Sequence, residues 1–166
     1  MLRFVYSHCI AVTGRGELEQ SRDRADVSGV PQPHDTSYVR VVVVEDDRLF
    51  RSVLATYCRS IGMHVVAEIP DGQAALELLS NDNADVGEHP DLILTDCQMP
   101  RMDGISLVRH LRARGDGTPV IMLSGQQDAR VAEVARAAGV NCFLPKPLST
   151  QSLQDALAQT FPGWAA

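Results

Sequence analysis

Five short apolar runs, each followed by a stretch with helical periodicity, constrain the fold of this chain more than any other feature. Most of the runs are rich in Val, Ile and Leu, as buried strands of a parallel sheet are, but the run at 64–68 is half-polar, which suits an edge strand. They cover residues 39–44, 64–68, 91–95, 119–123 and 140–144, and helices are expected at 48–61, from 71 to about 79, around 105–111, at about 128–138 and at 152–161. Alternating strands and helices predict an α/β fold, namely a doubly wound five-stranded parallel sheet in a three-layer α/β/α arrangement.

Each predicted helix has an apolar stripe that is expected to face the sheet. Asp71 and Ser149 are placed to cap the second and fifth helices, and Gly62 and Gly139 to end the first and fourth. The expected inward-facing residues are Leu49, Val53, Tyr57 and Ile61 in the first helix, Ala74, Ala75, Leu78 and Leu79 in the second, Ile105, Val108 and Leu111 in the third, and Leu153, Ala156 and Leu157 in the fifth.

The 166 residues suit one folded domain. Residues 1–38 mix Gly, Ser, Asp, Arg and Pro without a sustained hydrophobic period, which predicts a flexible N-terminal extension. The folded domain is expected at 39–161, followed by a C-terminal tail at 162–166. Because the last predicted helix lies so close to residue 166, the interpretation is a stand-alone domain whose output is either the binding of a partner or the transfer of a chemical group to one.

Composition argues against two classes of partner. The net charge of −6 disfavours a nucleic-acid-binding surface, since such domains usually have a basic face. No apolar run approaches the roughly 20 residues that would span a bilayer, and the N-terminus is only weakly signal-like, so a cytoplasmic protein is predicted. The four cysteines form no C-x-x-C pair, which indicates reduced thiols rather than a zinc site or a disulfide framework.

Polar residues follow the predicted strands where they end. Glu45 and Asp46 follow the first strand, Asp96 the third, Ser124 the fourth and Lys146 the fifth. The carboxyl ends of parallel strands share one edge of a sheet, which is where ligands bind in such folds. Three carboxylates held together repel one another unless a cation joins them, and hard oxygen ligands without His or Cys suit Mg²⁺. Alternatively, Asp96 only caps the following turn, and Glu45 and Asp46 are solvated acids at a helix start.

Lys146 favours the first interpretation. It is the only lysine in a chain with 15 Lys and Arg residues, and it lies between two prolines at a strand end rather than on a helix. An ammonium group there can reach an anion at a metal site. Ser124 adds a hydroxyl donor, so the set could neutralise charge while Asp96 attacks phosphorus. The sequence has no nucleotide-binding loop, so the phosphoryl group would arrive on a donor.

These motifs resemble the receiver domain of two-component response regulators, over about residues 39–161. The resemblance lies in Glu45-Asp46, in Thr95-Asp96-Cys97-Gln98-Met99-Pro100-Arg101-Met102-Asp103-Gly104, in Ser124-Gly125 and in Lys146-Pro147, which fall in order along the chain. It implies a CheY-like, flavodoxin-like fold and a phosphorelay switch that catalyses only its own phosphorylation and dephosphorylation. The run from Asp96 to Pro100 is also similar to receivers attached to hybrid kinases.

The resemblance implies a role for each site residue. Asp96 would be the phosphoacceptor, Asp46 a direct Mg²⁺ ligand, Glu45 a ligand through water, and Gln98 a ligand through its backbone carbonyl. Lys146 would pair with the phosphoryl group, with a cis peptide before Pro147. Ser124 and Phe143 would be the switch pair, although the family often has Thr and Tyr at these positions.

The implied partners are a sensor histidine kinase or a histidine phosphotransfer protein, an unidentified downstream effector, and a second copy of the chain. Two alternatives stay open. A Mg²⁺-dependent phosphatase with an Asp nucleophile would resemble this chain in its sheet, but such enzymes have an Asp-x-Asp motif after the first strand. A receiver-fold adaptor that is never phosphorylated would be expected to lack an active-site residue, and none is missing.

Overall fold

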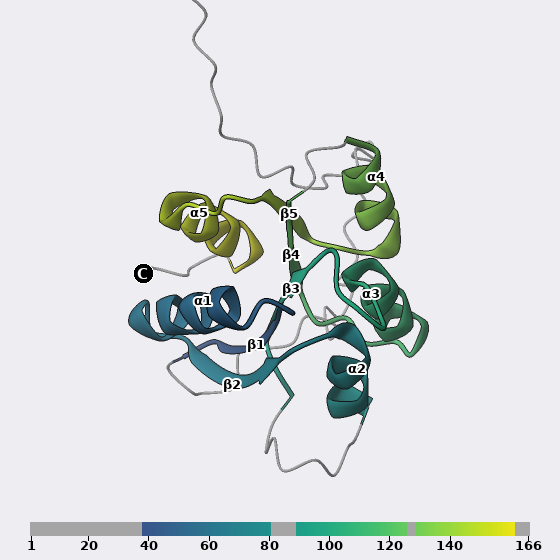
Figure 1. Ribbon diagram of the computed structural model, residues 1–166, viewed down its shortest axis with the longest axis horizontal. Coiled ribbons are helices and arrows are strands. Elements are labelled where there is room, and N and C mark those ends of the chain that lie inside the picture. Colours follow the sequence, from purple (N-terminus) through teal and green to yellow (C-terminus); the bar gives the residue numbers. More distant parts are fainter. Residues whose placement is uncertain (1–37, 81–88, 126–128, 162–166) are drawn as a thin grey trace, which may run out of the picture.

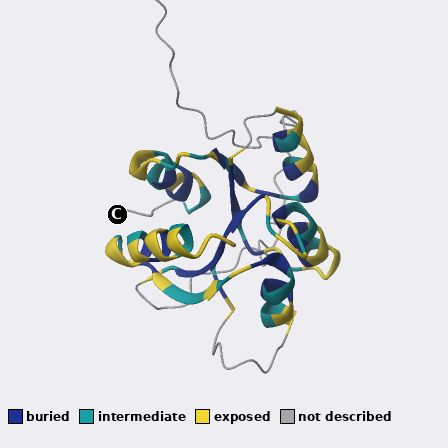
Figure 2. Cartoon of the chain, in the orientation of Figure 1, coloured by how far each residue is buried: buried dark blue, intermediate teal, exposed yellow. Residues whose placement is uncertain are grey.

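The sheet has the predicted topology. The computed structural model describes residues 38–80, 89–125 and 129–161, and within them five strands pair in parallel in the order β2-β1-β3-β4-β5 (Figure 1). The strands are β1 (Arg40–Val44), β2 (His64–Ile69), β3 (Leu92–Asp96), β4 (Val120–Ser124) and β5 (Cys142–Pro145). Each of β1, β3 and β4 is buried along its whole length, whereas β2 at the sheet edge is half-exposed, as its polar sequence predicts (Figure 2).

Five helices cover the two faces of the sheet and complete the three layers (Figure 1). They are α1 (Arg48–Ser60), α2 (Gly72–Ser80), α3 (Gly104–Ala113), α4 (Ala129–Ala138) and α5 (Thr150–Thr160). Helices α1 and α5 pack on one face against a core that includes Val41, Leu92 and Leu123. Helices α2, α3 and α4 pack on the other face around Val42, Ile93 and Met122. The predicted doubly wound α/β fold is therefore confirmed.

The predicted apolar stripe of α1 is right in its second half, where Tyr57 and Ile61 are half-buried against the core, and wrong in its first half. Leu49 and Val53, expected in the core, are 79% and 65% exposed, while Leu54, Ala55 and Cys58 are buried. Both sets repeat at helical spacing, so the period alone does not decide which of them faces the sheet. In α2 the same ambiguity hid Leu76, which is buried, whereas Ala74 and Leu78 are only half-buried. The predicted inward residues of α5 are all buried.

The predicted helix boundaries hold. The Asp71 carboxylate accepts hydrogen bonds from the first amides of α2, and Ser149 caps α5 within a capping box. Gly62 and Gly139 have φ of +86° and +100°, a conformation that favours glycine, just after α1 and α4. The Lys146–Pro147 peptide bond is cis, as expected.

The cysteines meet the sequence expectation only in part. Cys58 and Cys97 are free and buried, but Cys142 is disulfide-bonded, so the prediction of reduced thiols does not hold for Cys142. Cys9, most of the predicted extension at 1–38 and the tail at 162–166 lie outside the described residues. In the part of the chain that the structure describes, no helix is both long and apolar enough to cross a bilayer.

Candidate functional site

The parallel register brings the predicted site residues to one edge of the sheet. Val44 pairs with Thr95 and Asp96 with Leu123, so the end of β1 lies beside the end of β3, and the end of β3 beside the end of β4. Glu45 and Asp46 follow β1 directly. Asp96 is the last residue of β3. Residues separated by about 50 positions in the sequence thus become neighbours.

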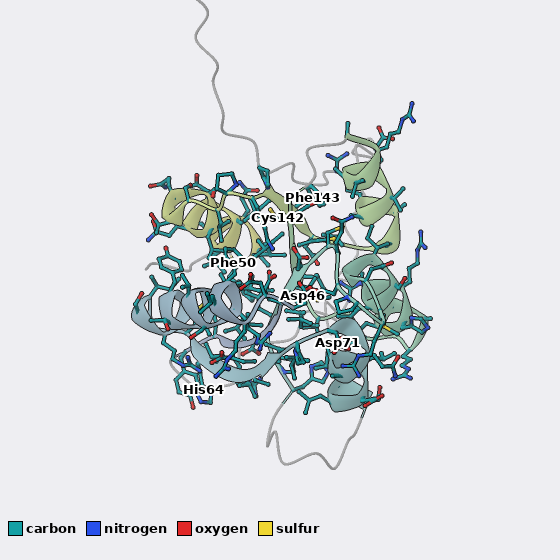
Figure 3. The ribbon with its side chains drawn as sticks, in the orientation of Figure 1. Asp46, Phe50, His64, Asp71, Cys142 and Phe143 are labelled. Carbon is teal, nitrogen blue, oxygen red and sulfur yellow. The ribbon has the colours of Figure 1, made fainter. Side chains whose placement is uncertain are left out.

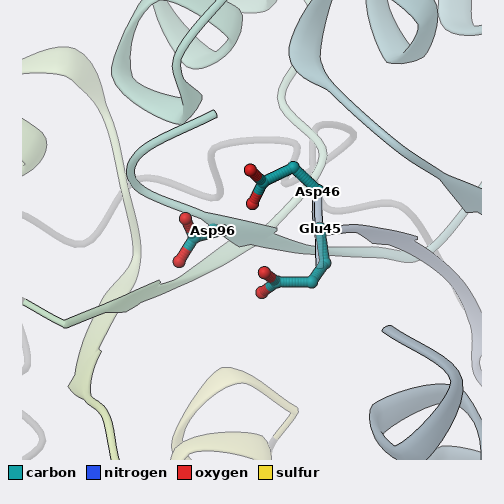
Figure 4. Close-up of side chains that lie close together, drawn as sticks. All are labelled: Glu45, Asp46 and Asp96. Atoms are coloured by element: carbon teal, nitrogen blue, oxygen red, sulfur yellow. The ribbon is translucent and has the colours of Figure 1, made fainter. Parts of the chain in front are cut away.

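Glu45, Asp46 and Asp96 form a carboxylate cluster (Figure 4). One carboxylate oxygen from each lies within 4.8 Å of the others, which is close enough for all three to contact one ion. Glu45 and Asp96 are 1% and 5% exposed, and Asp46 is exposed at the surface. Two buried carboxylates and one exposed carboxylate form an oxygen-lined site that suits a hard divalent cation. The exposed position of Asp46 leaves the site accessible to a further ligand.

Lys146 joins two members of the cluster. Its Nζ atom lies 2.8 Å from Glu45 Oε2 and 2.7 Å from Asp96 Oδ1. The same ammonium group lies 4.5 Å from the centre of the Phe50 ring on α1 (Figure 3), a cation–π contact. Two carboxylates and one aromatic face therefore fix the Lys146 side chain beside Asp96.

Burial in the cluster shifts the pKa values of Glu45 and Lys146 in opposite directions, but the pKa of each group is raised overall. Burial raises the pKa of Glu45, and the charge of Asp96 raises it further, so that the hydrogen bond from Lys146 only partly compensates. Burial lowers the pKa of Lys146, but hydrogen bonds to Asp96 and Glu45 outweigh this effect and raise the pKa overall. The difference arises because Glu45 faces one like charge and one opposite charge, whereas Lys146 faces two opposite charges.

The first turn of α1 holds the acidic loop in place. Asp47 caps α1, since its carboxylate accepts a hydrogen bond of 2.9 Å from the Phe50 amide. The Asp47 amide in turn donates to Glu45 Oε1 at 3.4 Å. The Arg51 guanidinium donates to the backbone carbonyls of Glu45 and Asp46. The acidic pair is thus anchored to the helix that begins two residues later.

The β3–α3 loop, residues 97–103, orients Asp96. The Gln98 amide donates a 3.0 Å hydrogen bond to Asp96 Oδ2, so that Lys146 and Gln98 hold different oxygens of one carboxylate. A Cβ atom at Gly104 would lie 2.2 Å from the Asp96 carbonyl oxygen, so glycine is required for the loop to return this closely to the strand.

The remaining predicted residues lie around this centre. Ser124 is fully buried at the end of β4. Phe143 is half-buried in β5 and pairs in register with Met122, two residues before Ser124. Burial raises the pKa of the Cys97 thiol, next to Asp96, which keeps this thiol protonated and makes it a poor nucleophile.

The sequence analysis missed four residues that contact the site or its loops. Phe50, Arg51 and Arg101 were not assigned any role, and Asp71 was assigned only a cap. Arg51 lies in the first turn after the acidic pair, a position that could have indicated a role. The contacts of Phe50 with Lys146 and of Arg101 with Asp71 join elements distant in the sequence.

Comparison with known proteins identifies the family. The family model described as the response regulator receiver domain matches residues 41–158, which is most of the chain. The chain belongs to this family. Response regulator receiver domains are signalling switches, generally not enzymes in the usual sense.

Named relatives agree with this assignment. The chain is 40% identical over 111 residues to "Regulator of RpoS" of Escherichia coli (strain K12), which covers 66% of this chain and 30% of that protein. It is 34% identical over 115 residues to "Response regulator MprA" of Mycolicibacterium vanbaalenii, which covers 69% of this chain and 47% of that protein. The matched region therefore spans less than half the length of these curated relatives.

Solved structures show the same fold. The receiver domain of the putative response regulator NarL from Mycobacterium tuberculosis superposes with a TM-score of 0.67 at 31% identity, covering 76% of this chain and 98% of that one. The chemotaxis protein CheY4 of Vibrio cholerae has a TM-score of 0.66 at 24% identity, covering 75% of this chain and 100% of that one. The fold is thus CheY-like.

Glu45→Gln should stabilise the metal-free protein, relative to wild type, by an amount that increases as pH rises above about 4, near the ordinary pKa of a Glu side chain. The raised pKa of Glu45 means that the folded protein favours the protonated carboxyl group. The stability that this group contributes is full below its unfolded-state pKa and is lost as pH rises through its folded-state pKa. Gln does not titrate, so the Gln variant does not lose stability in this way. Urea denaturation in EDTA at a series of pH values measures this difference in stability. The control substitution is Glu77→Gln, because Glu77 is exposed on α2. A difference that stays constant or shrinks as pH rises would contradict the assigned electrostatics.

Proposed function

We propose that the chain accepts a phosphoryl group on Asp96 and thereby switches its binding to a partner. The observation that carries the proposal is the contact of Lys146 Nζ with Asp96 Oδ1 at 2.7 Å, beside two further carboxylates. An Asp that only capped a turn would need no such ammonium partner. The alternative of solvated surface acids does not fit Glu45, whose side chain is almost completely buried.

The cluster fits a divalent cation, and Mg²⁺ is the proposed cofactor. Three carboxylate oxygens within 4.8 Å of one another, with no His or Cys ligand in the cluster, are the donor set that Mg²⁺ prefers. Asp46, Asp96, the Gln98 carbonyl and, through water, Glu45 would hold the ion. When bound, it would supply positive charge for the oxygens of an incoming phosphoryl group.

The residues of the chain divide the work of phosphoryl transfer. A carboxylate oxygen of Asp96 forms a bond to phosphorus while the P–N bond of a phosphohistidine donor breaks, and the donor imidazole leaves with its electron pair. Lys146 neutralises charge on the phosphoryl oxygens, and the Gln98 amide keeps the carboxylate oriented. Catalysis here is mainly positioning and electrostatics, as is general for phosphoryl transfer.

The proposed switch uses Ser124 and Phe143. The Ser124 hydroxyl would move toward the new phosphoryl charge from its buried position at the end of β4. Phe143 lies on the adjacent strand, half-buried against the core on the α4 side of the sheet. A shift of the hydroxyl would free space that the ring can fill, which would change the face made by α4, β5 and α5.

The proposed donor is a histidine kinase or histidine phosphotransfer protein, and its proposed contact is α1. Leu49 and Val53 are exposed on α1, one turn apart, and α1 begins two residues after Asp46. We propose that a donor which brings a phosphohistidine to Asp96 also contacts these two apolar side chains. The phosphoryl group of such a donor comes from ATP, which would place the protein in the cytoplasm. The downstream effector and a second copy of the chain are the proposed partners of the switched face.

Asp96→Asn should abolish labelling of the protein by a small acyl phosphate in the presence of Mg²⁺, because the amide is not a nucleophile toward phosphorus. Intact-mass spectrometry measures the label. Asp103→Asn is the matched control, since Asp103 lies in the same loop and Asn caps α3 equally well. Label retained in the Asp96 variant, or lost in the Asp103 variant, would contradict the assignment.

Two further measurements on the wild-type protein distinguish the two alternatives. A phosphatase would hydrolyse a phosphomonoester with steady turnover, whereas we expect none, because the position two residues after Asp96 is occupied by Gln98 instead of a second Asp. A receiver-fold adaptor would not bind beryllium fluoride in the presence of Mg²⁺, whereas a phosphoacceptor should bind it.

Leu49→Ser should slow transfer from a phosphorylated histidine phosphotransfer protein by at least about fivefold, because a central apolar contact in an interface is worth about 1 kcal/mol or more. Labelling by a small acyl phosphate should be unchanged. Val134→Ser, on exposed α4, is the matched control. Equal transfer rates for the two variants would contradict the proposed contact on α1.

A further inference from the structure

Arg101 has a backbone conformation that costs energy. Its φ is +64°, in the left-handed region, where a residue with a Cβ atom is strained and glycine is not. Among the described residues no other non-glycine residue has a positive φ. Glycine would relieve the strain, so the Arg101 side chain is expected to make a contact that offsets it.

The contact is an ion pair with a buried carboxylate. The Arg101 guanidinium binds Asp71 Oδ2, and the Asp71 side chain is 2% exposed at the start of α2 (Figure 3). The other oxygen, Oδ1, accepts the amides of Gln73 and Ala74, each at 3.0 Å. Asp71 is therefore bonded on both sides, to α2 and to the β3–α3 loop. The mechanism of phosphoryl transfer makes no direct use of this carboxylate.

A second contact joins the same two segments. The Gly72 amide donates a 3.2 Å hydrogen bond to the Met102 carbonyl. A Cβ atom at Gly72 would lie 2.6 Å from that carbonyl oxygen, so the backbones approach as closely as glycine allows. The start of α2 and the loop at 101–102 thus form one packed unit.

Arg101, in this packed unit, follows Gln98 by three residues in the sequence. Gln98, which holds Asp96 through its amide, is in the same loop, and the other end of the loop is fixed where the Gly104 amide donates to the Cys97 carbonyl at 3.0 Å. The loop is therefore held at Cys97 by α3 and at Arg101 by α2. Release of the second point would let the segment from Gln98 to Arg101 move.

We propose that Asp71 and Arg101 are positioning residues that set the affinity of the carboxylate cluster for a divalent cation. They act through the β3–α3 loop, by fixing the Gln98 backbone whose amide orients Asp96. The inference rests on the proposed function, because it assigns the loop to the metal site. Neither residue touches the cluster itself.

The test is calorimetric titration of the folded, metal-free full chain with Mg²⁺. Arg101→Gly keeps the left-handed backbone accessible and removes the ion pair, so the Kd for Mg²⁺ should rise about tenfold, as is typical when a residue supporting a metal ligand is lost. Arg101→Lys keeps the charge and should restore the Kd to within about threefold of wild type. Thermal unfolding in EDTA is measured alongside.

Arg114→Gln is the matched control. Arg114 also bridges the α3 side to α2, through the Ser80 hydroxyl, but at the far ends of both helices. Its Kd should equal that of wild type. A role confined to stability would lower the thermal midpoint of Arg101→Gly and leave its Kd unchanged, and that result would overturn the proposal. An equal rise in the Kd of both variants would also overturn it.

The two proposals fail in different ways. A wild-type protein without measurable Mg²⁺ binding would overturn the proposed function together with the positioning role. Wild-type binding with an unchanged Arg101→Gly variant would overturn the positioning role alone.

Discussion

The repulsion of carboxylates gathered at one sheet edge is the constraint on which the rest of the site depends. Glu45 and Asp96 are buried within reach of one another, and burial in a medium less polar than water makes their mutual repulsion costly. Lys146, the only lysine of the chain, offsets this cost by contacting both. The Lys146 ammonium group already balances part of the negative charge. The exposed position of Asp46 leaves the cluster accessible to a divalent cation and a phosphoryl group.

The fold supplies this cluster through its strands and tunes it through its loops. Parallel pairing of β1, β3, β4 and β5 places their carboxyl ends together, so that the acids and the lysine converge without any one segment containing the site. The loops then fix orientation. Arg51 holds the acidic loop from α1, and Gln98 holds one oxygen of Asp96. The strand framework thus determines which groups meet, and neighbouring helices determine how rigidly they are held.

Sequence patterns predicted the strands and their polar ends well, because burial on both faces leaves continuous apolar runs and parallel pairing places the strand ends at one edge. The patterns did not predict which side of α1 faces solvent, since two interleaved stripes share one period and Leu49 belongs to the exposed one. The contact of Phe50 with Lys146 and the pair of Asp71 with Arg101 each join elements distant in sequence. A local pattern holds no information about such pairs.

The central claim is that these carboxylates hold one divalent cation beside the residue that accepts phosphorus. Anomalous diffraction from crystals soaked in Mn²⁺, as a substitute for Mg²⁺, tests it directly. We expect one strong peak about 2 Å from carboxylate oxygens of both Asp46 and Asp96. Saturating Mn²⁺ that gives no peak at the cluster, or a peak only elsewhere on the molecule, would show that these carboxylates do not share one cation.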